Sequence, residues 1–359
     1  MKKIDWRLMI YPILISLVLG LGAGILGTAW TSSYLSDYAV QLNELTAPLR
    51  LSAQKPRNFP SSYKEAVDDF VSQTLPSVVQ VYRDASGALG YRQDEADRVG
   101  MVLTTDGWVG IESGRTAPAS LMESRIHVNN QWLSVQAQKF DPVTGIIFVK
   151  VEADHLPVVS LGKGREAHRG EQVFVVEDAA GFVVASVKGE EWAQDGSVSS
   201  DEPNRLLTLD RDVQPGSLVF NLSGEVIGLV RTDHAVLPIE AMTPSFKSLL
   251  EHQTISRPTL GVMAVDLSHG LDISATLTSG HTTGALLYGS GSLVRSGAAR
   301  QAGLKPSDII LSVNDESVDA SHTLDELIEQ YRPGDQVRLQ VERAKVGQTI
   351  TVTLGERAP

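Results

Sequence analysis

The stretch that decides the fold is LLTLDRDVQPGSLVFNLSGEVIGLVR, residues 206–231. An apolar run ends at Asp210, a Gln-Pro-Gly turn follows at residues 214–216, and a second apolar run breaks at Ser223-Gly224 before a third begins. Gly, Pro and Ser at such breaks are typical of tight turns between strands. The stretch therefore predicts a strand, a turn, a second strand, a hairpin and a third strand.

On both sides of this stretch, short apolar runs alternate with turns from about residue 77 to residue 245. The pattern predicts a hairpin turn at residues 105–107 and short helices at 63–75 and 245–252. Several short strands at this spacing are typical of an all-β sandwich or barrel. Besides the strands of the opening stretch, we expect strands at residues 77–82, 132–140, 145–151, 171–177 and 182–189.

The last hundred residues have a different pattern. Two runs near the end, QVRLQVE and TITVTL, alternate apolar and polar residues, which predicts a hairpin with one buried face. Before them, Leu324, Leu327 and Ile328 recur at helical spacing, with Ser321 as the expected N-cap. The sequence therefore predicts a compact α+β module after the β-rich part.

The N-terminus predicts a membrane anchor. Residues 9–30 carry no charged side chain, and about 20 apolar residues in a helix cross a hydrocarbon core. Lysine and arginine side chains precede this run, so we expect residues 1–8 to remain cytoplasmic. A cleaved signal peptide is the alternative, because Gly27-Thr28-Ala29 resembles a cleavage site. The mixed, proline-containing residues 31–61 are expected to form a linker.

Composition excludes several classes of function. The chain has 359 residues, of which 42% are hydrophobic and 21% charged, as in ordinary globular proteins. A net charge of −12 without a basic cluster argues against a nucleic-acid partner. The absence of cysteine removes disulfides, thiolate zinc sites and cysteine nucleophiles. No His, Asp or Glu set has ligand spacing, so we expect neither a metal nor a cofactor.

Several motifs together resemble the HtrA/Deg family of trypsin-like serine proteases in its membrane-anchored form with one PDZ domain. GMVLTTDGWV is similar to the family's histidine-loop hairpin, DPVTGIIFVKV to its aspartate loop, and LTLDRDVQPG with NLSGEVIGLV to its serine loop. RPTLGV, RSGAARQAGLKPSDIILSVNDESV and RPGDQVRLQVER are similar to its PDZ domains. The resemblance implies a mostly β fold: a chymotrypsin-like double β-barrel over residues 62–252, then an α+β PDZ domain over residues 257–357, behind the N-terminal transmembrane helix.

The same resemblance implies a degenerate catalytic triad. Such a protease needs a serine, a histidine base, a carboxylate and backbone donors for the oxyanion. The family's histidine position falls on Gly114 and its aspartate position on Gly145. Two registers place the serine position either on Ser217 or on Pro215. We therefore expect no catalytic residues and a pseudoprotease rather than an enzyme.

An active serine endopeptidase with a rearranged site is the alternative. It would use Ser217 as nucleophile and would bring a histidine from elsewhere, for example His127 in RIHVNN. An ordinary turn serine and an ordinary strand histidine are the competing interpretations of these two residues.

The PDZ domain keeps the parts that bind peptides in its family. Such domains add an extended C-terminal peptide as a strand, and backbone amides hold its carboxylate. The resemblance assigns this role to Thr259, Leu260, Gly261, Val262, Leu324, Leu327 and Ile328. Alternatively, these residues fill the core beneath a closed groove, or the Gly/Ser/Thr-rich segment 269–283 covers it.

The resemblance implies an extracytoplasmic function in protein quality control, in the periplasm or outside the cell. The expected partners are peptide C-termini or unfolded proteins, the membrane through the N-terminal helix, and either a homo-trimer or a hetero-oligomer with active relatives. An oligomeric scaffold without a peptide ligand is a further alternative.

Overall fold

The computed structural model describes residues 60–83, 90–91, 96–114, 120–178, 181–192, 196–270 and 272–357. The predicted cytoplasmic flank, the transmembrane anchor and nearly all of the linker lie outside these residues. Among the residues that are described, no helix is both long enough and apolar enough to cross a membrane.

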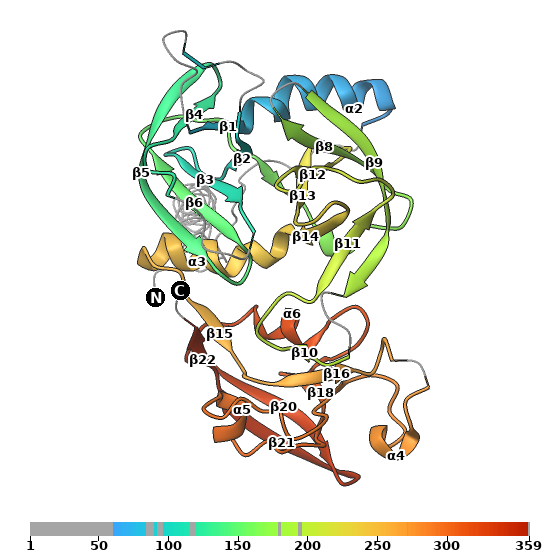
Figure 1. Ribbon diagram of the computed structural model, residues 1–359. Coiled ribbons are helices and arrows are strands. Elements are labelled where there is room, and N and C mark those ends of the chain that lie inside the picture. Colours follow the sequence, from blue (N-terminus) through green and yellow to red (C-terminus); the bar gives the residue numbers. More distant parts are fainter. Residues whose placement is uncertain are drawn as a thin grey trace, which may run out of the picture. The chain divides into compact units, whose positions relative to one another are not determined.

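The first half of the β-rich part is a closed barrel of six antiparallel strands (Figure 1). The strands run in the order β1-β2-β3-β6-β5-β4 around the barrel. Gly107 closes the predicted hairpin turn with φ +101°, a conformation that side chains with a Cβ rarely adopt. The strands are β1 Val78–Tyr82, β2 Arg98–Val102, β3 Trp108–Glu112, β4 Arg125–Val128, β5 Gln131–Asp141 and β6 Ile146–Val151.

The second half is another six-stranded barrel, which closes where β12 pairs with β13. Its order is β12-β8-β9-β11-β14-β13, and the short β7 adds to β13 in parallel. The opening stretch supplies β11, β12 and β13, as the sequence predicts. The strands are β7 Ser160–Leu161, β8 Gln172–Asp178, β9 Gly181–Trp192, β11 Arg205–Leu209, β12 Leu218–Asn221, β13 Glu225–Val230 and β14 Ala235–Pro238.

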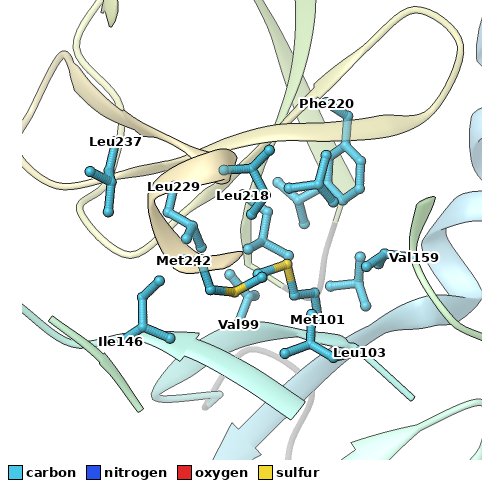
Figure 2. Packing of buried hydrophobic residues seen from close by; sticks show 14 of the residues in the cluster. Val99, Met101, Leu103, Ile146, Val159, Leu218, Phe220, Leu229, Leu237 and Met242 are labelled. Atoms are coloured by element: carbon cyan, nitrogen blue, oxygen red, sulfur yellow. The ribbon is translucent and has the colours of Figure 1, made fainter. Parts of the chain in front are cut away.

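A shared hydrophobic core joins the two barrels (Figure 2). Met101 and Ile146 of the first barrel pack in the same cluster as Leu218 and Phe220 of the second. Met242, which precedes the last helix of this part, lies among them. Each barrel also has its own interior cluster. Burying two sheet faces against each other removes apolar surface from water, which is the main force that holds this architecture together.

Helical segments flank the double barrel. Phe70 lies at the end of the first one, where its ring packs at a tilt against Phe174 and edge-to-face against Phe220, with centroids 4.7 and 5.1 Å apart. One continuous helix is predicted for residues 63–75, but the structure widens it into a π-helix at Phe70. The segments are α2 Tyr63–Asp69, the π-helix η1 Phe70–Thr74, the 3₁₀-helices η2 Leu75–Ser77, η5 Gly164–Glu166 and η6 Ile239–Met242, and the closing helix α3 Thr243–His252.

The C-terminal module is a sheet in the order β16-β17-β18-β20-β21 with a core of its own. β19 pairs with β18, and β15 pairs with β22 in a separate two-stranded sheet. The elements are β15 Arg257–Thr259, β16 Met263–Asp266, α4 Ala275–Thr278, β17 Ala285–Leu286, α5 Ala298–Gln301, β18 Ile309–Val313, β19 Glu316–Ser317, α6 Leu324–Ile328, β20 Gln336–Arg343, β21 Val346–Thr353 and β22 Gly355–Arg357.

Helix α6 begins later than the sequence suggests. Ser321 was the expected N-cap, but its N–H group and that of His322 both donate to the Asp319 carboxylate in a turn before the helix. Thr323 is the N-cap instead, in a capping box with Glu326. The prediction of Ser321 as the cap is therefore wrong.

Candidate functional site

The loops that the resemblance assigns to the triad meet at a cavity of about 280 Å³. Gly114 and Pro215 both line this cavity. Gly145 is adjacent, because its carbonyl accepts a hydrogen bond of 3.0 Å from the Ser113 N–H group. The full lining comprises Asp97, Arg98, Val99, Glu112, Ser113, Gly114, Glu177, Gln214, Pro215, Gly216 and Arg231.

Ser217 does not present its hydroxyl to this cavity. The residue is only 1% exposed, and its Oγ donates to the carbonyl of Gln214 at 2.5 Å. In the described part of the chain, no histidine is hydrogen-bonded to Ser217. His127 lies on β4, where its ring contacts Gln80 at 3.2 Å and packs against Trp132. The serine is thus held as a turn residue.

Backbone donors of the turn at residues 214–217 are also engaged. The Gln214 N–H group donates to Glu177, the Gly216 N–H group to the Val230 carbonyl, and the Ser217 N–H group to the Gln214 carbonyl. Pro215 has no N–H group. An oxyanion hole requires preorganised donors directed at the reacting oxygen. In this conformation the turn offers none.

The carboxylate of Asp141, near the expected aspartate position, is occupied as well. It is fully buried and accepts hydrogen bonds from the Val143 N–H group and the Thr144 hydroxyl within its own turn. It also accepts from the Ser245 hydroxyl at 2.5 Å and from Arg257 at 3.1 Å. These four donors give Asp141 a structural role in fixing the loop.

Glu112 is the titratable group that stands out in the cavity. It is 4% exposed, its Oε2 accepts from the Gly114 N–H group at 3.0 Å, and its Oε1 has no hydrogen-bond partner. Burial raises the pKa of Glu112 to about 7, against the opposing effects of that hydrogen bond and of the charges of Arg231 and Arg98. The cavity therefore holds a buried carboxyl whose charge is favoured by two arginines of the same lining.

In the C-terminal module, the expected carboxylate loop is occupied from within the chain. The N–H groups of Leu260 and Gly261 donate to the Asp201 carboxylate at 2.8 and 3.1 Å. Gly261 adopts φ +79°, and a Cβ there would lie 3.0 Å from Gly297. Leu260, Val262, Leu324, Leu327 and Ile328 all belong to the core cluster of the module.

The strand beside this loop also has a partner. Residues 198–199, which form β10, pair antiparallel with β16. The segment 269–283 contains α4, and its His269 ring packs against Trp192 at a centroid distance of 4.1 Å. The edge of β16 is thus covered by residues 198–199 rather than by the segment 269–283.

Comparisons with known proteins cover both the C-terminal module and the β-rich part before it. A family model of the PDZ domain matches residues 258–354. A probable periplasmic serine endoprotease DegP-like of Marinomonas sp. is 27% identical over 271 residues, which cover 72% of this chain and 56% of the relative. A protein of the same description from Halomonas elongata is 27% identical over 285 residues, 75% of this chain and 59% of the relative.

Solved structures share the fold. The HtrA-type protease AlgW with a tripeptide has a TM-score of 0.60 at 20% identity, over 83% of this chain and 98% of that one. The AlgW structure with a decapeptide has a TM-score of 0.57 at 19% identity, over 83% and 99%. The chain is thus similar to HtrA/Deg proteases in both sequence and fold. It spans 56–61% of the length of the curated relatives it matches.

This HtrA/Deg homologue has functional candidates that sequence reasoning missed. Glu112, Arg231 and Asp201 look like ordinary polar residues at strand ends and in loops. The signal for Glu112 was its place two residues before Gly114, at the end of an apolar strand. For Asp201 no local signal exists, because its partners lie about 60 residues later in the chain. Across the described ranges, no group of three or more His, Asp or Glu side chains could hold a metal ion.

The raised pKa of Glu112 predicts a pH-dependent stability of this homologue. The folded state favours the protonated form of Glu112. The free energy of unfolding should therefore fall as pH rises from about 4.5, the ordinary pKa of the carboxyl, to about 7, its pKa in the folded state. Glu112→Gln keeps a neutral side chain of the same shape. It should therefore be more stable than the wild type by up to about 3 kcal/mol at pH 8 but similar at pH 5.

Urea unfolding at both pH values measures this difference. The exposed Glu123→Gln is the matched control and should follow the wild type at both. A Glu112→Gln variant that is equally or less stable at pH 8 would show that the arginines keep the carboxylate charged without cost.

Proposed function

We propose that this chain is a catalytically inactive HtrA/Deg homologue that binds peptide C-termini or unfolded proteins through its PDZ domain. The observation that carries the proposal is the state of the cavity at the triad positions. The resemblance assigns Gly114 to the histidine position, Gly145 to the aspartate position, and either Pro215 or the buried Ser217 to the nucleophile position. Among the described residues, no histidine is hydrogen-bonded to Ser217, and the N–H groups of residues 214, 216 and 217 are engaged within the fold, so they are not free to bind an oxyanion.

Peptide binding is supported by the PDZ match and by the geometry of the carboxylate loop. The N–H groups of Leu260 and Gly261 point at one carboxylate, as PDZ domains require. The carboxylate is that of Asp201, and this internal contact supports the assignment of Leu260 and Gly261 to a carboxylate-binding loop.

Location and partners are part of the same proposal. The curated relatives are named periplasmic, and residues 9–30 form an apolar run without charge. We therefore place the folded part outside the cytoplasm, with the N-terminal helix as anchor. A homo-trimer, or a hetero-oligomer in which the chain regulates active relatives, would connect it to extracytoplasmic protein quality control.

A peptide-binding measurement tests the PDZ part of the proposal. The purified full chain is titrated with a pool of fluorescent decapeptides that have free C-termini and randomised last residues. The same pool with amidated C-termini is the control. Amidation removes the charge that the Leu260 and Gly261 N–H groups recognise, so it should weaken binding at least tenfold.

Equal binding of the two pools would contradict terminal recognition. No binding of either pool at high micromolar concentration would contradict peptide binding altogether and would favour the oligomeric scaffold.

A further inference from the structure

PDZ domains add their ligands to an edge strand of the sheet, which corresponds here to β16. β10 lies beside β16 with Val198 opposite Ala264 and Ser199 opposite Met263 (Figure 1). The pairing is antiparallel and extends by one residue, because the Ser200 N–H group donates to the Val262 carbonyl at 3.0 Å. A segment of the second barrel thus takes the place and direction of a bound peptide.

A carboxylate lies at the end of this strand. Asp201 follows directly, and its carboxylate accepts from Leu260 at 2.8 Å and from Gly261 at 3.1 Å to each oxygen. A peptide C-terminus would offer the same group, a carboxylate at the end of an extended strand. Because the chain continues beyond Asp201, a side chain provides the carboxylate in its place.

The opposite wall of the groove, which includes helix α6, also holds the segment. The Asn204 side chain donates to the Ser199 carbonyl at 2.6 Å, and the Asn204 N–H group donates to Asp325 of α6 at 3.2 Å. The next residue, Arg205, is buried and binds Glu326 of the same helix at 2.9 Å.

Little space is left between the segment and the groove. The cavity lined by Val198, Ser199, Ser200 and residues of β16 and α6 has a volume of only about 10 Å³. A water molecule needs about that much or more, so no side chain of a second ligand fits there. The segment and an external peptide therefore compete for one site.

We propose that residues 198–201 are a built-in ligand of the PDZ groove, and that an external peptide C-terminus binds only by displacing them. This inference rests on the proposed peptide-binding function and specifies its regulation. It also ties occupancy of the groove to the second barrel, since the displaced segment leads into β11.

Removal of the internal carboxylate is the first test. Asp201→Ala in the full chain should strengthen binding of the free-C-terminus decapeptide pool at least tenfold, because the Leu260 and Gly261 N–H groups are released. Asp212→Ala is the matched control: its side chain is 87% exposed in a loop of the same barrel, and it should bind like the wild type.

A reversible lock is the second test, and it does not depend on removing Asp201. The chain has no cysteine, so a Ser199→Cys/Met263→Cys variant carries one possible disulfide. Directly opposed residues of antiparallel strands have Cα atoms about 4.5–5.5 Å apart, which suits a disulfide. Oxidation should close the groove to the peptide pool, and reduction should reopen it.

The Gln340→Cys/Thr349→Cys variant is the control for the lock. These residues oppose each other in the exposed β20–β21 hairpin, so its oxidation should leave binding unchanged.

The outcomes separate the two proposals. If Asp201→Ala and the wild type bind the pool equally, or if the oxidised Ser199→Cys/Met263→Cys variant binds like the reduced one, the built-in ligand is refuted while peptide binding stands. If no variant binds any peptide but the disulfide between positions 199 and 263 forms readily, the segment occupies the groove and the proposed peptide function fails. If that disulfide does not form while the control disulfide does, the segment does not lie on β16 and the inference is overturned.

Discussion

Arg257→Met is expected to destabilise the folded chain by about 3–5 kcal/mol, the usual cost of removing one partner from a buried ion pair. Arg257 is 4% exposed, and its guanidinium donates to Asp141, Ser245 and the Ala241 carbonyl at 2.9–3.1 Å. It also lies 3.6 Å from Glu329. Methionine fills much of the same volume but leaves the Asp141 and Glu329 carboxylates without this counter-charge.

The free energy of unfolding in urea measures the effect. Arg338→Met is the matched control, because Arg338 pairs with Asp315 on the surface, where the side chains are 59% and 77% exposed. Exposed pairs contribute about 1 kcal/mol or less. Similar losses for both variants would mean that the Arg257 network contributes no more than a surface pair.

The second prediction is that the purified chain does not cleave a protein substrate. Enzymes accelerate their reactions by about 10⁶-fold or more, and a serine protease derives this from its nucleophile, base and oxyanion donors acting together. In this chain the Ser217 hydroxyl and the N–H groups of residues 214, 216 and 217 are all engaged within the fold. We therefore expect the purified full chain to degrade casein no faster than buffer.

The control for this assay is Ser217→Ala, which should give the same background. Because the Ser217 side chain is buried in its turn, Ser217→Ala should also lower the free energy of unfolding. A purely catalytic role of Ser217 would not predict this loss of stability. Casein cleavage that disappears in Ser217→Ala would support the rearranged active site instead.

Much of the fold could be predicted because its signals are local. Alternating runs and Gly-containing turns predicted most strands of the two barrels and the C-terminal hairpin to within a few residues, but no strand was predicted at β14. The helix boundaries were less predictable. Ser, Thr and Asp side chains favour both turns and helix N-caps. The sequence alone therefore does not show that Asp319 forms a turn with Ser321 and that α6 begins only after Thr323.

The candidate site could be predicted only in outline. Counting residues along the motifs led to Gly114 and Gly145, which the structure places around one cavity wall. The places of two carboxylates could not be predicted: Glu112 in the triad cavity and Asp201 in the PDZ groove. The burial of Glu112 and the pairing of Asp201 with Leu260 depend on segments that meet only after folding. In a sequence, such acidic residues look like solvated loop residues.

The central claim is that the chain has no activated serine at the cavity of the triad positions. Labelling with a fluorophosphonate, which reacts covalently with activated serines, tests this claim most directly. The purified full chain is incubated with the probe beside an active HtrA-type protease, and intact mass is recorded. We predict complete labelling of the active protease and no mass increase for this chain, with or without added peptides. A single added probe that is lost in Ser217→Ala would contradict the account.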